Sequence, residues 1–349
     1  MKAFLRSLAA VPRILRDLIA AFLALAVALP LWVLPWGAAC RLGRRYGTLV
    51  GAFSRTARRV GMINLRRAYG PEMSPARAES GTREVFANLG QSLAEAIQFA
   101  RRFRREGSRL EDIAEAEDVE LMERLLADPR PKVFVNGHLG SWEVATMMIA
   151  QRSGSRGAVI YRRVDNPFLD FLVRRFRSGA ASRLIEKRGA VSESVRRLER
   201  GESVAVLLDE SGGPTGLFLD FFGRPASTRK TAALLSIRTG APIVVGAALR
   251  RQGPSGRRFL FKLALLEPPR GPDARPEAVA ELTREILRIY EGWVREDPLQ
   301  WRWVHWRWKH RPGGREETYT REDLDAAFPE VVRSERPWAR IRRGADFRP

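Results

Sequence analysis

The fold of this chain is decided by the stretch Val133-Phe-Val-Asn-Gly-His-Leu-Gly-Ser-Trp-Glu143. Its first three residues are apolar and β-branched or aromatic, which predicts a short buried strand. The glycines that follow predict a loop carrying His138, and Ser141 predicts the N-cap of a helix that starts near Trp142. A strand, a glycine-containing loop and a helix in this order indicate one unit of an α/β domain.

The same alternation continues along the chain. Apolar segments predict further strands over residues 158–161, 203–208, 243–249 and 259–266. Helical spacing predicts helices over 142–151, 168–176, 228–239 and 276–296, and residues 50–130 are predicted to be helical apart from a loop over 67–74 that ends at a Ser74 N-cap. Strands that alternate with helices indicate an α/β fold with a central, mostly parallel sheet flanked by helices.

The N-terminal region is long and apolar. Residues 18–40 contain no charged side chain, which is enough to cross about 30 Å of hydrocarbon as a helix. Pro30 and Pro35 predict a kink or an early end of this helix, and Trp32 and Trp36 suit a membrane interface.

Three interpretations of this region are open: a retained or re-entrant anchor, a cleaved signal peptide, and a lipoprotein signal ending at Cys40. No clear small-x-small cleavage site precedes a polar start, and residues 37–39 lack the large aliphatic residue of lipoprotein signals. Basic residues flank the run on both sides, so they do not set its orientation. We expect a membrane-anchoring helix within residues 1–45, a catalytic domain over 46–312 and a polar basic tail over 313–349.

The amino-acid composition limits the kinds of partner and site that the protein can have. The 349 residues carry a net charge of +21, which predicts an anionic partner: nucleic acid, anionic lipid or an acidic carrier protein. Arginine-rich composition is also what a GC-rich genome produces. The single cysteine excludes an intramolecular disulfide, and with only three histidines (His138, His305 and His310) a His/Cys zinc cluster is not expected.

His138 and Glu143 form the candidate catalytic pair. On one continuous helix, five positions would separate their side chains by about 140°. At the entry from a loop into a helix, the two side chains can meet. The carboxylate then holds one imidazole nitrogen and leaves the other free as a base, while the helix N-terminus favours developing negative charge.

The segment Asn136-Gly-His-Leu-Gly-Ser-Trp-Glu143 resembles the His-x4-Asp/Glu motif of the lipid A biosynthesis acyltransferases, the lauroyl/myristoyl transferase family related to the glycerolipid acyltransferases. Four further segments resemble blocks of this family in the same order: Tyr161-Arg162 with Asn166-Pro-Phe-Leu-Asp170, then Leu208-Asp-Glu-Ser211, Phe221-Phe-Gly-Arg-Pro-Ala-Ser-Thr228, and Gln300-Trp-Arg-Trp-Val-His-Trp-Arg-Trp-Lys309. The resemblance covers roughly residues 1 to 312. Glu210 departs from it, because the family commonly has Gln there. A Phe-Pro-Glu-Gly-Thr-type motif is missing, which argues against a phosphatidic-acid synthase.

The resemblance implies an O-acyltransferase in which His138 takes a proton from a hydroxyl of the acceptor, and the oxygen attacks the thioester of an acyl carrier. Glu143 would orient His138, and Arg162 would stabilise the oxyanion or hold a phosphate. Substrate-binding roles are implied for Asn136, Gly140, Arg163, Asn166, Asp209, Glu210, Arg224 and Thr228. No metal or cofactor is required.

The resemblance also implies the partners and the location. The donor is acyl carrier protein or acyl-CoA, and the acceptor is a lipid A precursor or another glycolipid such as a phosphatidylinositol mannoside. The catalytic domain is expected on the cytoplasmic face of the inner membrane.

The sequence also has features of two other classes of protein. The charge and the Trp-rich segment 301–308, interleaved with basic residues, would suit a non-enzymatic protein that binds single-stranded nucleic acid or a membrane surface. A hydrolase would need a nucleophile motif such as Gly-x-Ser-x-Gly, and Gly140-Ser141 does not fit that pattern. The ordered blocks favour the acyltransferase, with no nucleic-acid partner.

Overall fold

A seven-stranded sheet forms the centre of the protein. The structure is a computed structural model that describes residues 2–106, 113–152, 157–178, 182–251, 258–269, 276–314, 316 and 319–329. The strand order is β1-β9-β8-β2-β5-β3-β4, and only β9 runs antiparallel to its neighbour β8. The strands are β1 (Ala114–Ala116), β2 (Val133–Asn136), β3 (Gly157–Tyr161), β4 (Ser182–Glu186), β5 (Ser203–Leu207), β8 (Ile243–Leu249) and β9 (Phe259–Leu266). The predicted α/β class with a mostly parallel sheet is confirmed.

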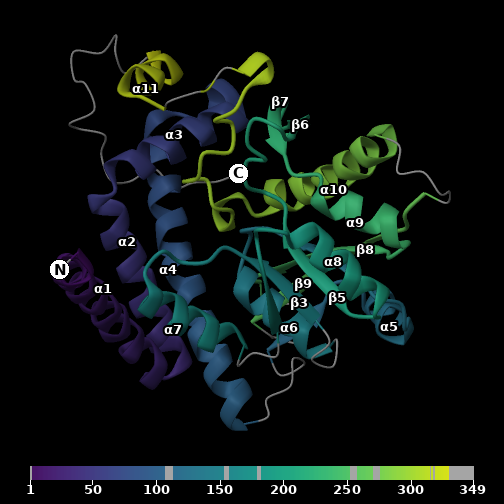
Figure 1. The fold of residues 1–349 in the computed structure, drawn as a ribbon. Coiled ribbons are helices and arrows are strands. Elements are labelled where there is room, and N and C mark those ends of the chain that lie inside the picture. Colours follow the sequence, from purple (N-terminus) through teal and green to yellow (C-terminus); the bar gives the residue numbers. More distant parts are fainter. Residues whose placement is uncertain are drawn as a thin grey trace.

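Helices cover both faces of this sheet (Figure 1). They are α1 (Lys2–Val33), α2 (Trp36–Phe53), α3 (Arg55–Tyr69), α4 (Pro75–Glu106), α5 (Val119–Ala127), α6 (Trp142–Arg152), α7 (Pro167–Ser178), α8 (Ala190–Glu199), α9 (Thr231–Thr239), α10 (Pro276–Glu296) and α11 (Arg321–Ala327). The chain runs from β2 through α6 to β3 and through α7 to β4, then returns through α8 to β5 and through α9 to β8. Because such crossovers are right-handed, the change of direction puts α6 and α7 on one face and α8 and α9 on the other.

The apolar strands lie at the predicted places. Each element that was not predicted has a local cause. Residues 114–116 form β1, not helix, and β4 was not predicted. Both are edge strands with charged residues, so neither has the apolar run of a central strand. The helix predicted from Thr228 begins at Thr231, because Thr228 ends strand β7 (Arg224–Thr228), which pairs with β6 (Leu217–Phe221). The Ser74 cap is confirmed, since its Oγ accepts the Arg77 N–H at 3.3 Å.

The β6–β7 turn explains the Phe-Phe-Gly segment. Phe222 and Gly223 both have positive φ, 56° and 69°, as a two-residue turn between twisted strands requires. Phe222 is nevertheless buried. Its N–H donates to Glu291 at 2.8 Å, and the Arg295 guanidinium lies 4.3 Å from its ring centre. The segment therefore packs in the core.

The N-terminal region contains one helical stretch, Arg13–Val33, that is long and apolar enough to cross a membrane. Helix α1 continues through Pro30 and ends before Pro35, which precedes the first residue of α2. The interfacial position predicted for Trp36 is wrong. Its side chain is buried, with its ring centre 6.3 Å from that of Phe259, because α2 turns back onto the domain.

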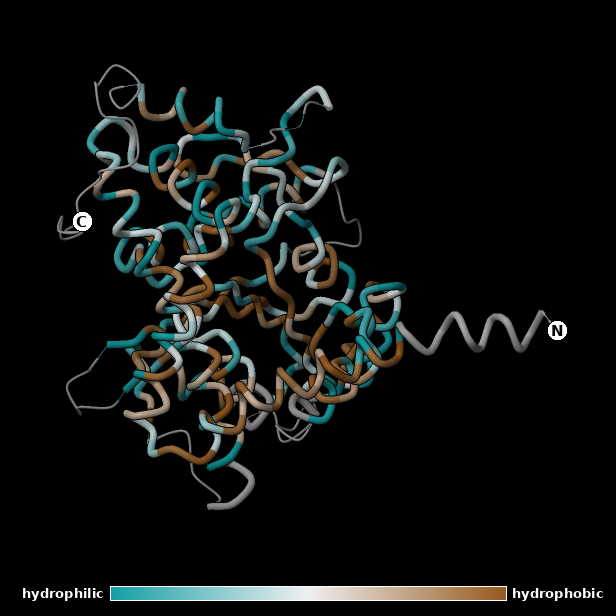
Figure 2. The backbone as a smooth tube through the Cα atoms, turned by 90° about the vertical axis from the view of Figure 1, so that its left-hand side faces the viewer, coloured by the Kyte–Doolittle hydropathy of each residue, from teal (hydrophilic) through white to brown (hydrophobic). Residues whose placement is uncertain are grey.

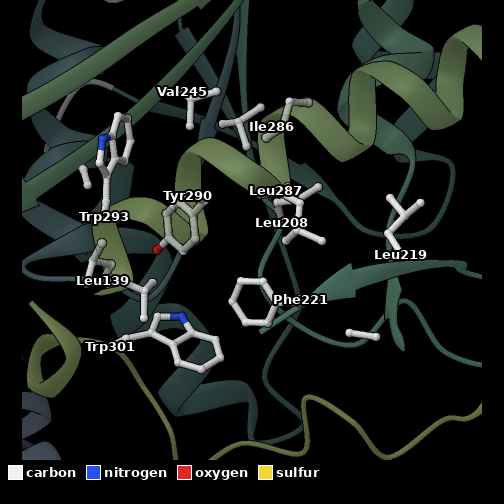
Figure 3. Close-up of a cluster of buried hydrophobic side chains, with 14 of the residues drawn as sticks. Leu139, Leu208, Leu219, Phe221, Val245, Ile286, Leu287, Tyr290, Trp293 and Trp301 are labelled. Carbon is white, nitrogen blue, oxygen red and sulfur yellow. The ribbon is translucent and has the colours of Figure 1, made fainter. Parts of the chain in front are cut away.

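Hydrophobic residues concentrate toward the middle of the molecule (Figure 2). In the close-up of this core, Leu139 and Trp301 lie beside Tyr290 and Phe221 (Figure 3). Trp301, Trp303 and Trp308 are fully buried. The membrane-interface and nucleic-acid interpretations of the Trp-rich segment are therefore wrong for these three side chains, which serve as core packing. Part of the predicted tail is ordered, as α11 packs on α3, while residues 330–349 lie outside the described residues.

Candidate active site

Most of the predicted site residues follow strands at the carboxyl edge of the sheet. β2, β5 and β3 are parallel, and each is followed directly by a site segment: the His138 loop, Asp209 and Arg162. The strand order reverses at β2 and β5, because the chain leaves β2 in one direction and returns through β5 to β8. Open α/β sheets bind ligands at such a reversal.

His138 is paired with Asp209. The imidazole Nδ1 lies 2.9 Å from Asp209 Oδ1, and the His138 backbone N–H donates to Oδ2 at 2.6 Å. The Asp209 side chain is fully buried, and that of His138 is 8% exposed. A carboxylate facing Nδ1 assigns the proton to Nδ1, which leaves Nε2 as the nitrogen that can accept a proton.

Asp209 is held as a carboxylate by several groups. The Trp301 indole N–H donates to Oδ2 at 2.8 Å. Burial acts to raise the pKa of Asp209. The charge and hydrogen bond of His138, with the charges of His305 and Arg302, outweigh burial and keep this pKa well below its ordinary value. The carboxylate is therefore available to stabilise a protonated His138.

Two glycines allow the His138 loop to pack this closely. A Cβ at Gly137 would lie 2.3 Å from the Tyr290 hydroxyl oxygen. Gly140 has φ +64°, and a Cβ there would lie 2.1 Å from the Ala248 carbonyl oxygen. The Gly140 carbonyl accepts the Ser92 hydroxyl at 3.1 Å and an Arg250 N–H at 3.3 Å. Gly140 thus shapes the loop that carries His138, and its role in substrate binding stays a prediction.

Glu143 lies in the first turn of α6, next to the same loop. With Asn136 and Trp142 it lines a narrow cavity between α6 and the sheet, whose other walls are largely apolar: Thr146, Met147, Val159, Ile160, Leu184, Ala205, Val206 and Leu207. Asp209 is the carboxylate that faces Nδ1 of His138, and the orienting role of Glu143 stays a prediction. Asn136 Oδ1 accepts the Gly137 N–H at 2.8 Å, and its amide donates to the Trp142 carbonyl at 3.2 Å.

The second predicted block follows β3. Arg162 and Arg163 are exposed, and the Arg163 guanidinium lies 3.7 Å from the Asp170 carboxylate. Asn166 Oδ1 accepts the N–H groups of Phe168 and Leu169, both at 3.0 Å, so Asn166 caps the start of α7.

Glu210 and Arg302 form an ion pair beside His138. The distance between Oε1 and Nη2 is 2.6 Å, and the Arg302 backbone N–H donates to the His138 carbonyl at 3.1 Å. Burial acts to raise the pKa of Glu210, but the charge of His138 and the hydrogen bond from Arg302 lower it. The Glu210 carboxylate is thus neutralised by a guanidinium.

Thr228 and Arg224 lie on the β6–β7 hairpin. Thr228 is fully buried, and its Oγ1 accepts an N–H from the buried Arg307 at 2.8 Å, while the Ser227 carbonyl accepts a second at 2.7 Å. Arg224, at the start of β7, is partly buried. Thr228 therefore anchors the C-terminal segment to the hairpin.

Sequence reasoning missed the part played by the C-terminal segment. Trp301 binds the Asp209 carboxylate, and Arg302 binds the His138 carbonyl. The two ring nitrogens of His305 lie 2.6 Å from the Arg302 carbonyl oxygen and 3.0 Å from that of Asp209. The signal for these roles was the match of this segment to a family block. Among the described residues, no group of three or more His, Cys, Asp or Glu side chains is placed to hold a metal ion.

His305 makes stability depend on pH. Burial, helped by the charge of Arg302, lowers the pKa of His305 from 6.5 to about 4. Between these values the unfolded chain binds more protons than the folded protein, so the free energy of unfolding falls as pH drops from 6.5 to 4. The His305 side chain is only partly buried, so solvent weakens this effect. We expect the free energy of unfolding to fall by about 1–2 kcal/mol over this pH range.

Thermal unfolding of the His305→Gln variant checks this expectation. The variant should show a flatter dependence on pH than the natural protein across this window. An unchanged slope would assign the pH dependence to other groups.

A doubly wound sheet with a buried histidine–carboxylate pair at its carboxyl edge is typical of an enzyme that uses the histidine as a general base. Comparison with known proteins makes this class specific. A family model described as bacterial lipid A biosynthesis acyltransferase matches residues 8–310, and the chain belongs to this family. The predicted family is confirmed, and the protein is an acyltransferase of lipid A biosynthesis.

Individual relatives agree with this assignment. The chain is 25% identical to the lipid A biosynthesis palmitoleoyltransferase of Escherichia coli (strain K12) over 292 residues, covering 83% of this chain and 91% of the relative. Identity and coverage are the same for a lipid A biosynthesis acyltransferase of Shigella flexneri. The lipid A biosynthesis lauroyltransferase of E. coli (strain K12) is 25% identical over 289 residues, covering 81% of this chain and 90% of the relative.

Proposed function

We propose that the protein moves a fatty acyl chain from an acyl-carrier thioester to a hydroxyl group of a lipid A precursor, with His138 as the general base. The observation that carries this proposal is the 2.9 Å contact between His138 Nδ1 and the buried Asp209 carboxylate. It fixes the tautomer that leaves Nε2 free to accept the hydroxyl proton.

The reaction then has two steps. Nε2 of His138 removes the proton as the acceptor oxygen bonds to the thioester carbonyl carbon, which gives a tetrahedral oxyanion. When the carbon–sulfur bond breaks, the imidazolium returns the proton to the departing thiolate, so the enzyme ends unchanged. Asp209 stabilises the imidazolium between the steps. General-base catalysis of this kind contributes about 10²–10⁴-fold.

Two further residues complete the proposed centre. Arg162, exposed at the end of β3, would stabilise the oxyanion or hold a phosphate of the acceptor. Glu143, which lines the cavity beside α6, would help to orient His138. The largely apolar walls of this cavity suit part of an acyl chain.

The proposed partners follow from the same chemistry. The donor is acyl carrier protein or acyl-CoA, and an acidic carrier would suit a chain of net charge +21. The acceptor is a lipid A precursor, with another glycolipid such as a phosphatidylinositol mannoside as the alternative. The Arg13–Val33 stretch supports a location at a membrane. We propose that this is the inner membrane, with the catalytic domain on its cytoplasmic face.

An acyl-transfer assay tests this proposal. Radiolabelled acyl-carrier thioester is offered with a purified lipid A precursor to membranes holding the natural protein, His138→Ala or Glu143→Ala. We expect His138→Ala to lose about 10²–10⁴-fold of the rate. His310→Ala serves as the matched control, because its ring contacts Ser211 and Glu316 and lies outside the proposed centre.

The outcomes separate the parts of the proposal. Equal product from His138→Ala would refute the general-base role. Loss in His138→Ala with full activity in Glu143→Ala would remove Glu143 from the groups that orient the base. Product with phosphatidylinositol mannoside but none with a lipid A precursor would replace the acceptor.

A further inference from the structure

We infer that α1 lies along the membrane surface instead of crossing the bilayer, and that α7 provides a second contact with anionic lipid headgroups beside it. This inference rests on the proposed membrane location alone and not on the proposed chemistry.

The catalytic domain binds α1 near both ends of its apolar run. Near the start, the Asp17 carbonyl accepts the Asn166 side-chain N–H at 2.9 Å. Near the end, the Trp32 carbonyl accepts an Arg101 N–H at 2.7 Å. Fifteen residues of helix separate the two carbonyls, which is about 22 Å along the helix axis. The domain therefore contacts α1 at both ends of this span, through α7 near Asp17 and through α4 near Trp32, and Figure 1 shows α2, α4 and α7 beside α1.

The exposure of the α1 side chains agrees with these contacts. The buried side chains lie on one side of the helix, near its two contacts with the domain: Asp17, Ala21 and Leu31 are each less than 10% exposed. The rest of the apolar surface is open along the whole run. The exposed large side chains are Ile14, Leu15, Leu18, Ile19, Phe22, Leu23, Leu25, Val27, Leu29 and Val33.

A perpendicular α1 would carry charged parts of the domain into the hydrocarbon. The bilayer core is about 30 Å thick, so the α7 end and the α4 end of the contact would sit at different depths within it. Helix α2 packs on α1 through Leu42 and Tyr46, and its Arg41 and Arg45 are exposed. Each charge placed in the core costs about 3 kcal/mol or more. An α1 that lies in the interface immerses its open face by about 5–10 Å and leaves these arginines in water.

Helix α7 lies at the same level as the polar start of α1. The Asn166–Asp17 hydrogen bond places the first turn of α7 where exposed Arg13 and Arg16 give way to the apolar run. On α7, Phe171 is 66% exposed. It lines a surface hollow together with Arg163, Pro167, Asp170, Arg174 and Arg175.

An exposed aromatic ring among arginines suits the headgroup region of a bilayer, where the ring enters the acyl boundary and the guanidinium groups meet phosphates. A carrier protein is the other partner that a basic surface would suit. The position of this hollow next to the open apolar face of α1 favours the lipid, because both surfaces can then meet one bilayer at once.

The first test measures on which side of the membrane α1 begins. Cys40 is the only cysteine in the chain, so a Cys40→Ala background accepts single labels. Ala3→Cys reports the N-terminus, and Glu199→Cys reports the catalytic domain. A membrane-impermeant maleimide should label both in inverted vesicles and neither in intact cells. Labelling of the two positions from opposite sides would overturn the inference. Thermal unfolding of each labelled variant confirms that it is folded.

The second test measures depth, in vesicles of phosphatidylethanolamine and phosphatidylglycerol that contain lipids with a quencher near the headgroup or near the chain end. An environment-sensitive fluorophore is placed at Leu23, the midpoint of the apolar run, or at Phe171. Both should be quenched more by the shallow quencher. Leu126 on α5 is the matched control, because it is 45% exposed and should remain unquenched.

Each departure has a definite meaning. Stronger quenching of Leu23 by the deep quencher would show that α1 spans the bilayer. An unquenched Phe171 would remove α7 from the membrane, and protection of that label by acyl carrier protein would assign the hollow to the carrier. All of these readouts are independent of acyl transfer.

Discussion

Replacing Asp209 with Asn is expected to lower the rate of acyl transfer by about 10³–10⁴-fold, because a carboxamide cannot reproduce the contacts of the carboxylate. Three N–H groups converge on Asp209: the His138 ring, the His138 backbone and the Trp301 indole. An Asn side chain offers one acceptor oxygen and turns an NH₂ group toward one of these donors. If that NH₂ faces Nδ1, it favours the tautomer with the proton on Nε2, which removes the base.

The same substitution should also lower stability. An Asn side chain leaves at least one of the buried N–H donors without an acceptor, which costs about 1–3 kcal/mol. Thermal unfolding separates this effect from catalysis, since kcat is measured at a temperature where the variant is still folded.

A double-mutant cycle with His138→Ala is the sharpest control for Asp209. If Asp209 acts through His138, then Asp209→Asn should have almost no further effect on the rate once the imidazole is gone. A full additional loss in the double variant would show that Asp209 serves the reaction by another route.

Gly140→Ala is expected to lower the free energy of unfolding by about 3 kcal/mol or more and to reduce activity with it. Two terms add at this position. A positive φ costs a residue with a side chain about 1–2 kcal/mol. The new methyl group would also meet the Ala248 carbonyl, a backbone atom that can move only with strand β8. The loop that carries His138 must shift in response.

Gly223→Ala is the matched control for Gly140. Gly223 has a similar φ of +69°, but a Cβ there meets nothing within 4 Å. Its loss should therefore be about 1–2 kcal/mol, the conformational term alone. Thermal unfolding of the two variants compares them directly. Equal losses would show that β8 yields to the methyl group and that the close approach at Gly140 is not required.

The central strands could be predicted because burial on both faces requires continuous apolar runs, as in residues 243–249. The edge strands could not. β1 has only three residues, and β4 carries Arg183 and Glu186, so neither differs from a loop until a neighbour pairs with it. The β6–β7 turn was hidden for another reason. Phe222 occupies a backbone conformation that normally selects Asn or Gly, and it is held there by contacts from α10.

The candidate site likewise has one part that local sequence predicts and another that depends on strand pairing. His138 stood out because its strand, loop and helix are contiguous in the chain. Its partner on Nδ1 did not, because Asp209 is 71 residues away and becomes a neighbour only through the pairing of β2 with β5. The local sequence pattern does not predict which strands are neighbours in the sheet. The sequence pattern therefore predicted Glu143, five residues away, as the carboxylate that holds one imidazole nitrogen, and placed Asp209 among the groups that bind substrate.

The contacts from Trp301 and Arg302 also set an order of events during synthesis. The two residues belong to the last sixth of the chain, yet they hold the Asp209 carboxylate and the His138 carbonyl. Helix α1 belongs to the first tenth and emerges from the ribosome at the outset. A nascent chain can therefore reach a lipid surface long before its histidine pair is assembled. At the proposed membrane location, the enzyme would therefore become competent only when translation is nearly complete.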